Sequence, residues 1–198
     1  MKVLLMTIVL VLVGSTGVAL YQKPKKTKTE MIQRGKYLVT VADCNGCHTP
    51  LKLTTQGPVS DSSRFLSGYP GSVPVPKVPT EILGPDKWAG LFSLENAFAG
   101  PWGVSFPRNL TPDTTTGLGS WTEAMFIKAL RTGKDMGEGR DILPPMPWES
   151  FGKMTDADLK AIFAYLGTLK PIENPVPDPI SPTGERLPTA TGGKLPNK

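Results

Sequence analysis

Three stretches of the chain place apolar residues at helical spacing. In the first stretch, Met31, Gly35, Leu38 and Ala42 recur every three or four residues and therefore fall on one helix face. This spacing predicts a helix over residues 29–43, ending directly before the first cysteine. The prediction matters because the residues that follow at once carry the distinctive chemistry of the chain.

The second and third predicted helices have end signals as well as apolar faces. Residues 120–131 start with Ser120 and Glu123, the spacing of a capping box, and Gly133 follows where a C-terminal cap belongs. Residues 155–169 start with Thr155, a favourable N-cap, and carry a clear apolar face: Leu159, Ile162, Phe163 and Leu166. The pattern predicts an all-α fold with three main helices.

The segments outside these helices are long and rich in proline and glycine. Residues 49–112 contain ten prolines and no sustained periodicity. A loop of that length is unusual in a compact domain, so we expect it to pack over something large and apolar. Residues 171–198 hold seven prolines and few apolar residues, which predicts an extended or disordered tail.

Composition and charge narrow the function classes. The 198 residues allow one domain with extensions, and 21 glycines and 21 prolines are too many for a helix-dense bundle. The net charge of +5 comes mostly from five lysines in residues 1–28, since residues 29–170 hold fourteen basic and fourteen acidic side chains. A nucleic-acid-binding domain carries its positive excess on the folded surface, so that class is disfavoured.

The residues Cys44-Asn45-Gly46-Cys47-His48 form a CxxCH motif, the attachment signature of c-type heme. Two thiols at this spacing reach the two vinyl groups of one porphyrin, and the next residue places an imidazole on the iron. These are the only two cysteines and the only histidine of the chain. The motif therefore predicts one covalently bound heme c.

Three other interpretations of the motif are weaker. A CxxC redox pair belongs after a strand in an alternating strand–helix pattern, which is not evident here. A zinc site would have three ligands in the motif and nothing nearby to complete four. A structural disulfide would leave His48 without a role.

A heme iron with one histidine ligand has an open position or a second axial ligand. Because the chain has no other histidine, methionine is the expected donor, and His/Met ligation suits an electron carrier. Met125 falls at core spacing in a helix, Met136 lies in a polar stretch, and Met154 directly precedes the third helix. Met146, between Pro145 and Pro147, is the favoured ligand; its alternative role is a hydrophobic plug.

Residues 1–21 predict export, because they form an apolar run of about membrane-spanning length behind Lys2. A cleaved signal peptide has Gly17 and Ala19 as a small-residue pair, whereas a retained anchor has the required length. The lysines of residues 22–28 oppose a simple anchor under the positive-inside rule. Heme attachment outside the cytoplasm nevertheless requires export, so we expect a retained anchor, a basic linker over 22–28 and a periplasmic domain over 29–170.

Three segments together are specific to a known family: RGKYLVTVADCNGCHTP, FPRNLTPDTTTGLGSWTEAMFIKALRTG and LPPMPWESFGKMTDADLKAIFAYLGTLKPIENPVP. With these segments, the sequence resembles a monoheme class I cytochrome c, of the kind found in cytochrome subunits of bacterial membrane-bound dehydrogenases and in anchored bacterial cytochromes. The resemblance implies that Cys44 and Cys47 hold the heme and that His48 and Met146 are its axial ligands. It also implies that Gly35 meets Tyr165 where two helices cross.

The chain departs from those dehydrogenase subunits in having one CxxCH motif where they carry three, and its region 60–100 is longer than in a minimal cytochrome. We therefore expect a single-electron carrier rather than an enzyme, exchanging electrons with a dehydrogenase, a quinol-oxidising complex or a terminal oxidase. The alternative is a heme enzyme or gas sensor with an open sixth position. Four further residues are candidates for hydrogen bonds to the propionates, with packing or solvent exposure as their other roles: Trp121, Trp148, Arg108 and Asn109.

Overall fold

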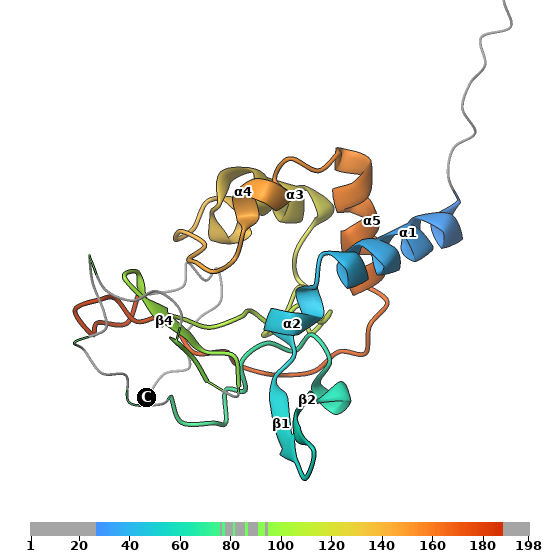
Figure 1. Cartoon of the computed structure of the whole chain (residues 1–198). Helices are drawn as coiled ribbons and strands as arrows, with labels where there is room; N and C mark the ends of the chain where they lie inside the picture. Colours follow the sequence, from blue (N-terminus) through green and yellow to red (C-terminus); the bar gives the residue numbers. More distant parts are fainter. Residues whose placement is uncertain are drawn as a thin grey trace, which may run out of the picture.

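A computed structural model describes residues 27–75, 77, 81, 86, 91–93 and 95–187. Within these residues the α-helices are α1 (Lys28–Val41), α2 (Cys44–His48), α3 (Glu123–Thr132), α4 (Trp148–Phe151) and α5 (Asp156–Leu166). Two 3-10 turns are η1 (Ser62–Arg64) and η3 (Asp135–Gly137). Figure 1 places α1, α3, α4 and α5 in the upper part of the molecule, with α2 and the strands below them.

The strands form two small antiparallel sheets. One is the hairpin β1 (Leu51–Thr54) and β2 (Gly57–Ser60); the other contains β3 (Leu91–Phe92), β4 (Phe98–Gly100) and β5 (Gly103–Ser105). The expectation of an all-α fold therefore misses these sheets. Strands of two to four residues show no alternation long enough to distinguish them from a loop.

The packing of α1 against α5 depends on one glycine (Figure 1). A Cβ atom placed on Gly35 would overlap the Ala161 carbonyl and lie 2.8 Å from Cβ of Tyr165. Only a residue without a side chain allows this approach. The structure thus confirms the predicted meeting of Gly35 with Tyr165.

Helix ends agree with the sequence prediction in part. Thr155 caps α5 by accepting a hydrogen bond from the Asp158 amide, and Gly133 ends α3 in the left-handed conformation, as predicted. The predicted Ser120 cap is wrong. The N-cap is Thr122, whose hydroxyl accepts a hydrogen bond from the Met125 amide, so the cap lies two residues later than predicted. The threonine hydroxyl offers the same acceptor as a serine, so the sequence allowed both sites.

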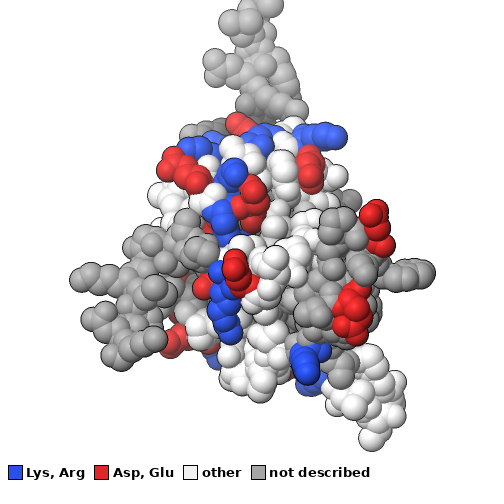
Figure 2. Space-filling view, turned by 90° about the vertical axis from the view of Figure 1, so that its left-hand side faces the viewer, with Lys and Arg blue, Asp and Glu red and all other residues white. Residues whose placement is uncertain are grey.

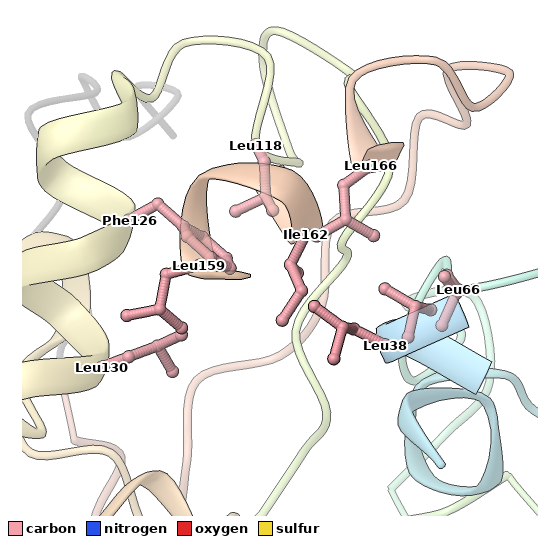
Figure 3. Packing of buried hydrophobic residues seen from close by; sticks show 9 residues of the cluster. Leu38, Leu66, Leu118, Phe126, Leu130, Leu159, Ile162 and Leu166 are labelled. Carbon is pink, nitrogen blue, oxygen red and sulfur yellow. The ribbon is translucent and has the colours of Figure 1, made fainter. Parts of the chain in front are cut away.

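Two groups of buried apolar residues stabilise the fold. The helical core lies where α1, α3 and α5 meet, and Leu118 joins it from the loop before α3. Figure 3 shows the side chains from the helices converging there: Leu38, Phe126, Leu130, Leu159, Ile162 and Leu166. The loop core lies among the strands and the loop before them: Tyr69, Ala97, Ala99, Val104 and Phe106. These two names are kept below.

The first part of the proline-rich tail packs on the domain. Asn174 is 3% exposed and donates to the carbonyls of Ser67 and Tyr69, at 2.7 and 2.8 Å. Ile180 forms a two-bond antiparallel bridge with Val104 of β5. The sequence predicts an extended or disordered tail. Its described part, residues 171–187, forms no helix and turns at residues 182–184, and Val176 and Ile180 pack against the loop core.

The proposed anchor in residues 1–21 and most of the linker over 22–28 lie outside the described residues. Among the helices that the structure does describe, none is long and apolar enough to cross a bilayer.

Candidate functional site

The CxxCH motif forms a single short helix, α2. Asp43 starts it from the left-handed region, with φ of 51°, and its carboxylate accepts a hydrogen bond from the Gly46 amide at 3.1 Å. This sharp turn separates α2 from α1. As a result, Cys44, Cys47 and His48 all reach the same cavity.

A hydrogen bond from its ring fixes the orientation of His48. Its side chain is buried, and Nδ1 lies 2.8 Å from the Arg108 carbonyl oxygen. Because a carbonyl can only accept, Nδ1 is the protonated nitrogen and Nε2 keeps its lone pair. Burial lowers the pKa of His48, although the hydrogen bond to Arg108 partly opposes that change. The ring is therefore neutral at pH 7 and has one nitrogen available to a metal.

The two thiols are in an unfavourable environment for redox chemistry. Burial raises the pKa of the Cys44 thiol to about 11 and also raises the pKa of the Cys47 thiol. Reactive cysteine pairs depend on the opposite change, a lowered thiol pKa that supplies thiolate. The local electrostatics thus argue against the redox-pair interpretation of the motif.

The cavity that contains these side chains has a volume of about 390 Å³, within the range of cofactor pockets. Its walls are mainly apolar and come from α3, α5, β4 and the loops: Phe98, Phe106, Leu110, Leu118, Phe126, Leu130, Ile142, Ile162 and Leu166. Met146 also lines it, from the segment between Pro145 and Pro147. Met125 and Met136 line a separate surface pocket, and Met154 packs against the helical core without lining the cavity.

One end of the cavity is polar. The Arg108 guanidinium binds the buried Asp135 carboxylate at 2.5 Å and lies 5.1 Å from the Trp121 ring. Arg140 also lines the cavity, and its carbonyl accepts a hydrogen bond from the Asp135 amide at 2.8 Å. Three buried atoms here have no hydrogen-bond partner, namely Nε of Arg108, Nε of Arg140 and Oδ2 of Asp135. Buried polar atoms rarely stay unsatisfied, so this end is suited to a ligand with polar groups.

The family model of cytochrome c matches residues 32–170. The chain belongs to the cytochrome c family. Members are electron-transfer proteins that hold heme c covalently, and the cavity fits this group. It offers two thiols beside a histidine, a largely apolar interior, and two arginines at the end where the propionates would need polar partners.

Three relatives of the cytochrome are dehydrogenase subunits. It is 30% identical over 175 residues to the fructose dehydrogenase cytochrome subunit of Gluconobacter japonicus, covering 87% of this chain and 29% of that one. It is 30% identical over 166 residues to the alcohol dehydrogenase (quinone) cytochrome c subunit of Komagataeibacter europaeus, covering 82% and 27%. It is 28% identical over 135 residues to the gluconate 2-dehydrogenase cytochrome c subunit of Pantoea cypripedii, covering 68% and 22%. The chain thus spans less than a third of the length of these relatives.

Two of the four residues that the sequence suggested as propionate partners line the cavity, and two do not. Arg108 and Trp121 line the cavity, whereas Asn109 and Trp148 do not. Asn109 is fully buried and donates to the Ile172 carbonyl at 2.7 Å, and the Trp148 ring packs against Gly133. These two residues support the fold.

Sequence reasoning did not identify Asp135, Arg140 or Pro179 as cavity residues. Asp135 begins the 3-10 turn η3, and the other two lie in irregular segments. No motif or local signal marks any of the three. The binding roles of Cys44, Cys47, His48 and Met146 remain predictions, now with all four residues around one cavity.

Proposed function

We propose that this cytochrome carries single electrons through one heme c bound to Cys44 and Cys47, with His48 and Met146 as axial ligands. The observation that supports it best is the fixed tautomer of His48. Its Nδ1–H donates a hydrogen bond to the Arg108 carbonyl, so Nε2 is left for iron in a cavity that Met146 also lines. A hydrogen bond of this type orients a ligating imidazole and increases its basicity.

When bound, heme iron supplies a one-electron couple between its ferric and ferrous states. The chain contributes the surroundings of that couple. Phe106, Leu130 and Ile162 exclude water from the cavity, and His48 and Met146 keep the same donor atoms in both states. Arg108 and Arg140 offset the negative charge of the propionates. A fixed donor set in an apolar site keeps reorganisation small, which suits electron transfer better than catalysis.

The proposed location is the periplasm, with residues 1–21 as the membrane anchor and residues 22–28 as its linker. The proposed partners are redox proteins, a dehydrogenase first among them, because the named relatives are dehydrogenase cytochrome subunits. Residues 29–170 form the heme domain in this scheme.

Figure 2 shows basic and acidic side chains interspersed on one face of the molecule. Docking through such a face would depend only weakly on salt.

The test is an optical spectrum of the heme-loaded protein in both oxidation states, repeated for Met146→Ala. We expect the native protein to be low-spin in both states, with a weak far-red band from sulfur–iron ligation, and not to bind carbon monoxide. Met146→Ala should lose that band and bind carbon monoxide. Met125→Ala is the matched control, because Met125 lines the surface pocket and not the heme cavity.

The contrary result would be a high-spin native protein that binds carbon monoxide readily. The sixth position would then be open, and a heme enzyme or gas sensor would replace the electron carrier. If Met125→Ala rather than Met146→Ala changed the spectrum, the ligand assignment alone would be wrong.

A further inference from the structure

The backbone of α2 ends without a following helical turn, so its last carbonyls need partners from elsewhere. Among the described residues, the Asn45 carbonyl is satisfied locally, by the Thr49 amide at 3.1 Å. The carbonyl of His48 accepts from the Gly68 amide at 2.8 Å. Three carbonyls around His48 remain to be satisfied by other groups.

The amide group of a single side chain is shared among all three, with two N–H bonds for three acceptors. The amide nitrogen of Asn96 lies 3.1 Å from the Gly46 carbonyl oxygen, 3.0 Å from that of Cys47 and 2.8 Å from that of Thr49. An atom surrounded by three acceptors must be the donor, which fixes the orientation of the amide. Asn96 is 3% exposed, so water does not compete with its amide for these three carbonyls.

Asn96 is held in place by a hairpin turn. It lies between β3 and β4 with φ of 67°, a left-handed conformation that asparagine tolerates better than most residues. Its backbone amide donates to the Ser93 carbonyl at 2.9 Å, and the Ser93 amide donates to the Ala97 carbonyl at 3.0 Å. The turn therefore presents the amide to α2 from a braced position.

We propose that Asn96 is a positioning residue for the iron ligand: it holds the backbone on both sides of His48 and so helps set the reduction potential. The inference rests on the proposed function, since it takes His48 as a ligand. The amide also adds positive partial charge at the carboxyl end of α2. Positive potential near iron favours the ferrous state, because that state carries one positive charge fewer.

Two variants remove the donor in different ways. Asn96→Gly keeps the left-handed backbone and deletes the amide, whereas Asn96→Asp keeps the shape and replaces the donor by a carboxyl group. Asn174→Asp is the matched control, because Asn174 is equally buried at 3% and also donates to two backbone carbonyls, neither of them in α2. All are measured as heme-loaded protein by potentiometric titration at pH 8, beside the proton NMR spectrum of the ferric state.

At the wild-type midpoint, we expect the ferrous-to-ferric ratio to fall about tenfold in Asn96→Asp, a shift of about 59 mV for one electron. Asn96→Gly should shift the ratio in the same direction by about threefold. Both should move the paramagnetically shifted resonances of the histidine ring. Asn174→Asp should leave the ratio within about twofold of wild type, even though it destabilises the fold.

The inference is overturned if both Asn96 variants keep the wild-type ratio within about twofold, or if Asn174→Asp shifts it equally. Asn96→Gly decides the matter if Asn96→Asp does not fold. Failure of the proposed function is a separate result, since it appears as a high-spin spectrum in the wild-type protein before any Asn96 variant is compared.

Discussion

The helical core and the loop core differ in what surrounds their buried residues. In the helical core, Leu159 is 0% exposed and belongs to a cluster of apolar side chains. The loops that enclose the loop core instead bury asparagines. Asn109 and Asn174 are 0% and 3% exposed, and both donate to backbone carbonyls more than 60 residues away in sequence.

The difference follows from how each region satisfies its backbone. A helix pairs its own amides and carbonyls, so only apolar faces have to meet. Irregular segments leave those groups unpaired, and a buried amide side chain is one way to pair them. The helical core should therefore be sensitive to changes of volume, and the loop region to the loss of single polar side chains.

Gly35→Leu should have the largest effect. The leucine side chain would overlap the backbone carbonyl of Ala161, which cannot move without separating α1 from α5. We expect a loss of more than about 4 kcal/mol, with little heme-loaded protein recovered. The measurements are heme yield per mole of protein and thermal unfolding followed at the heme absorption.

The control is Gly167→Ala, at the end of α5. A Cβ placed there meets no atom closer than 3.5 Å, and the backbone is already right-handed helical. This variant should be neutral or more stable by about 0.4–1 kcal/mol, because alanine restricts the unfolded chain. Normal heme yield for Gly35→Leu would contradict the close crossing.

Leu159→Ala and Asn109→Ala compare the two regions directly, since both side chains are fully buried. The leucine variant should lose about 2–5 kcal/mol, through lost burial and a cavity. The asparagine variant should lose about 2–4 kcal/mol. The Thr111 amide loses its acceptor, and the Ile172 carbonyl keeps only the longer hydrogen bond from the Thr111 hydroxyl, at 3.3 Å.

Native-state hydrogen exchange distinguishes the two losses. Leu159→Ala should weaken protection throughout the helices, as expected for global unfolding. Asn109→Ala should first expose the Ile172 amide, which is bonded to Thr111, through local opening of the tail. Equal loss of protection everywhere in both variants would contradict the distinction between the regions.

The smallest expected effect is on the pH dependence of the unfolding free energy. Hydrogen bonds from the Thr116 hydroxyl and amide, and from the Thr115 amide, lower the pKa of Asp113 in the loop before α3. A lowered folded-state pKa stabilises the protein above the unfolded value, about 3.9, and this contribution disappears as pH falls through the folded value. Asp113→Asn should cost about 1 kcal/mol or less at pH 7 and flatten the decline in unfolding free energy below about pH 4. Parallel pH curves for the variant and the wild type would contradict it.

The sequence predicted the helices around the helical core better than the strands and loops around the loop core. Periodicity and capping residues located α1, α3 and α5 to within a few residues, and Gly133 and Thr155 end and begin their helices as expected. The Ser120 cap failed because two acceptors, Ser120 and Thr122, stand close together. The short strands failed because pairing across a loop leaves almost no periodic signal.

The candidate site shows the same division. The CxxCH spacing, the helix periods and the caps are local properties, and so the sequence by itself determined the attachment motif and the helices around it. Tertiary structure alone decided that the Arg108 carbonyl holds the His48 ring, that Asn96 holds the α2 backbone, and that Asp135 and Arg140 form the polar end of the cavity. A backbone carbonyl is present in every residue, so it gives no sequence signal. A single amide or charged side chain does not recur at a regular spacing, so it gives none either. Their roles therefore exist only once the fold has brought residues about 50–60 positions apart into contact.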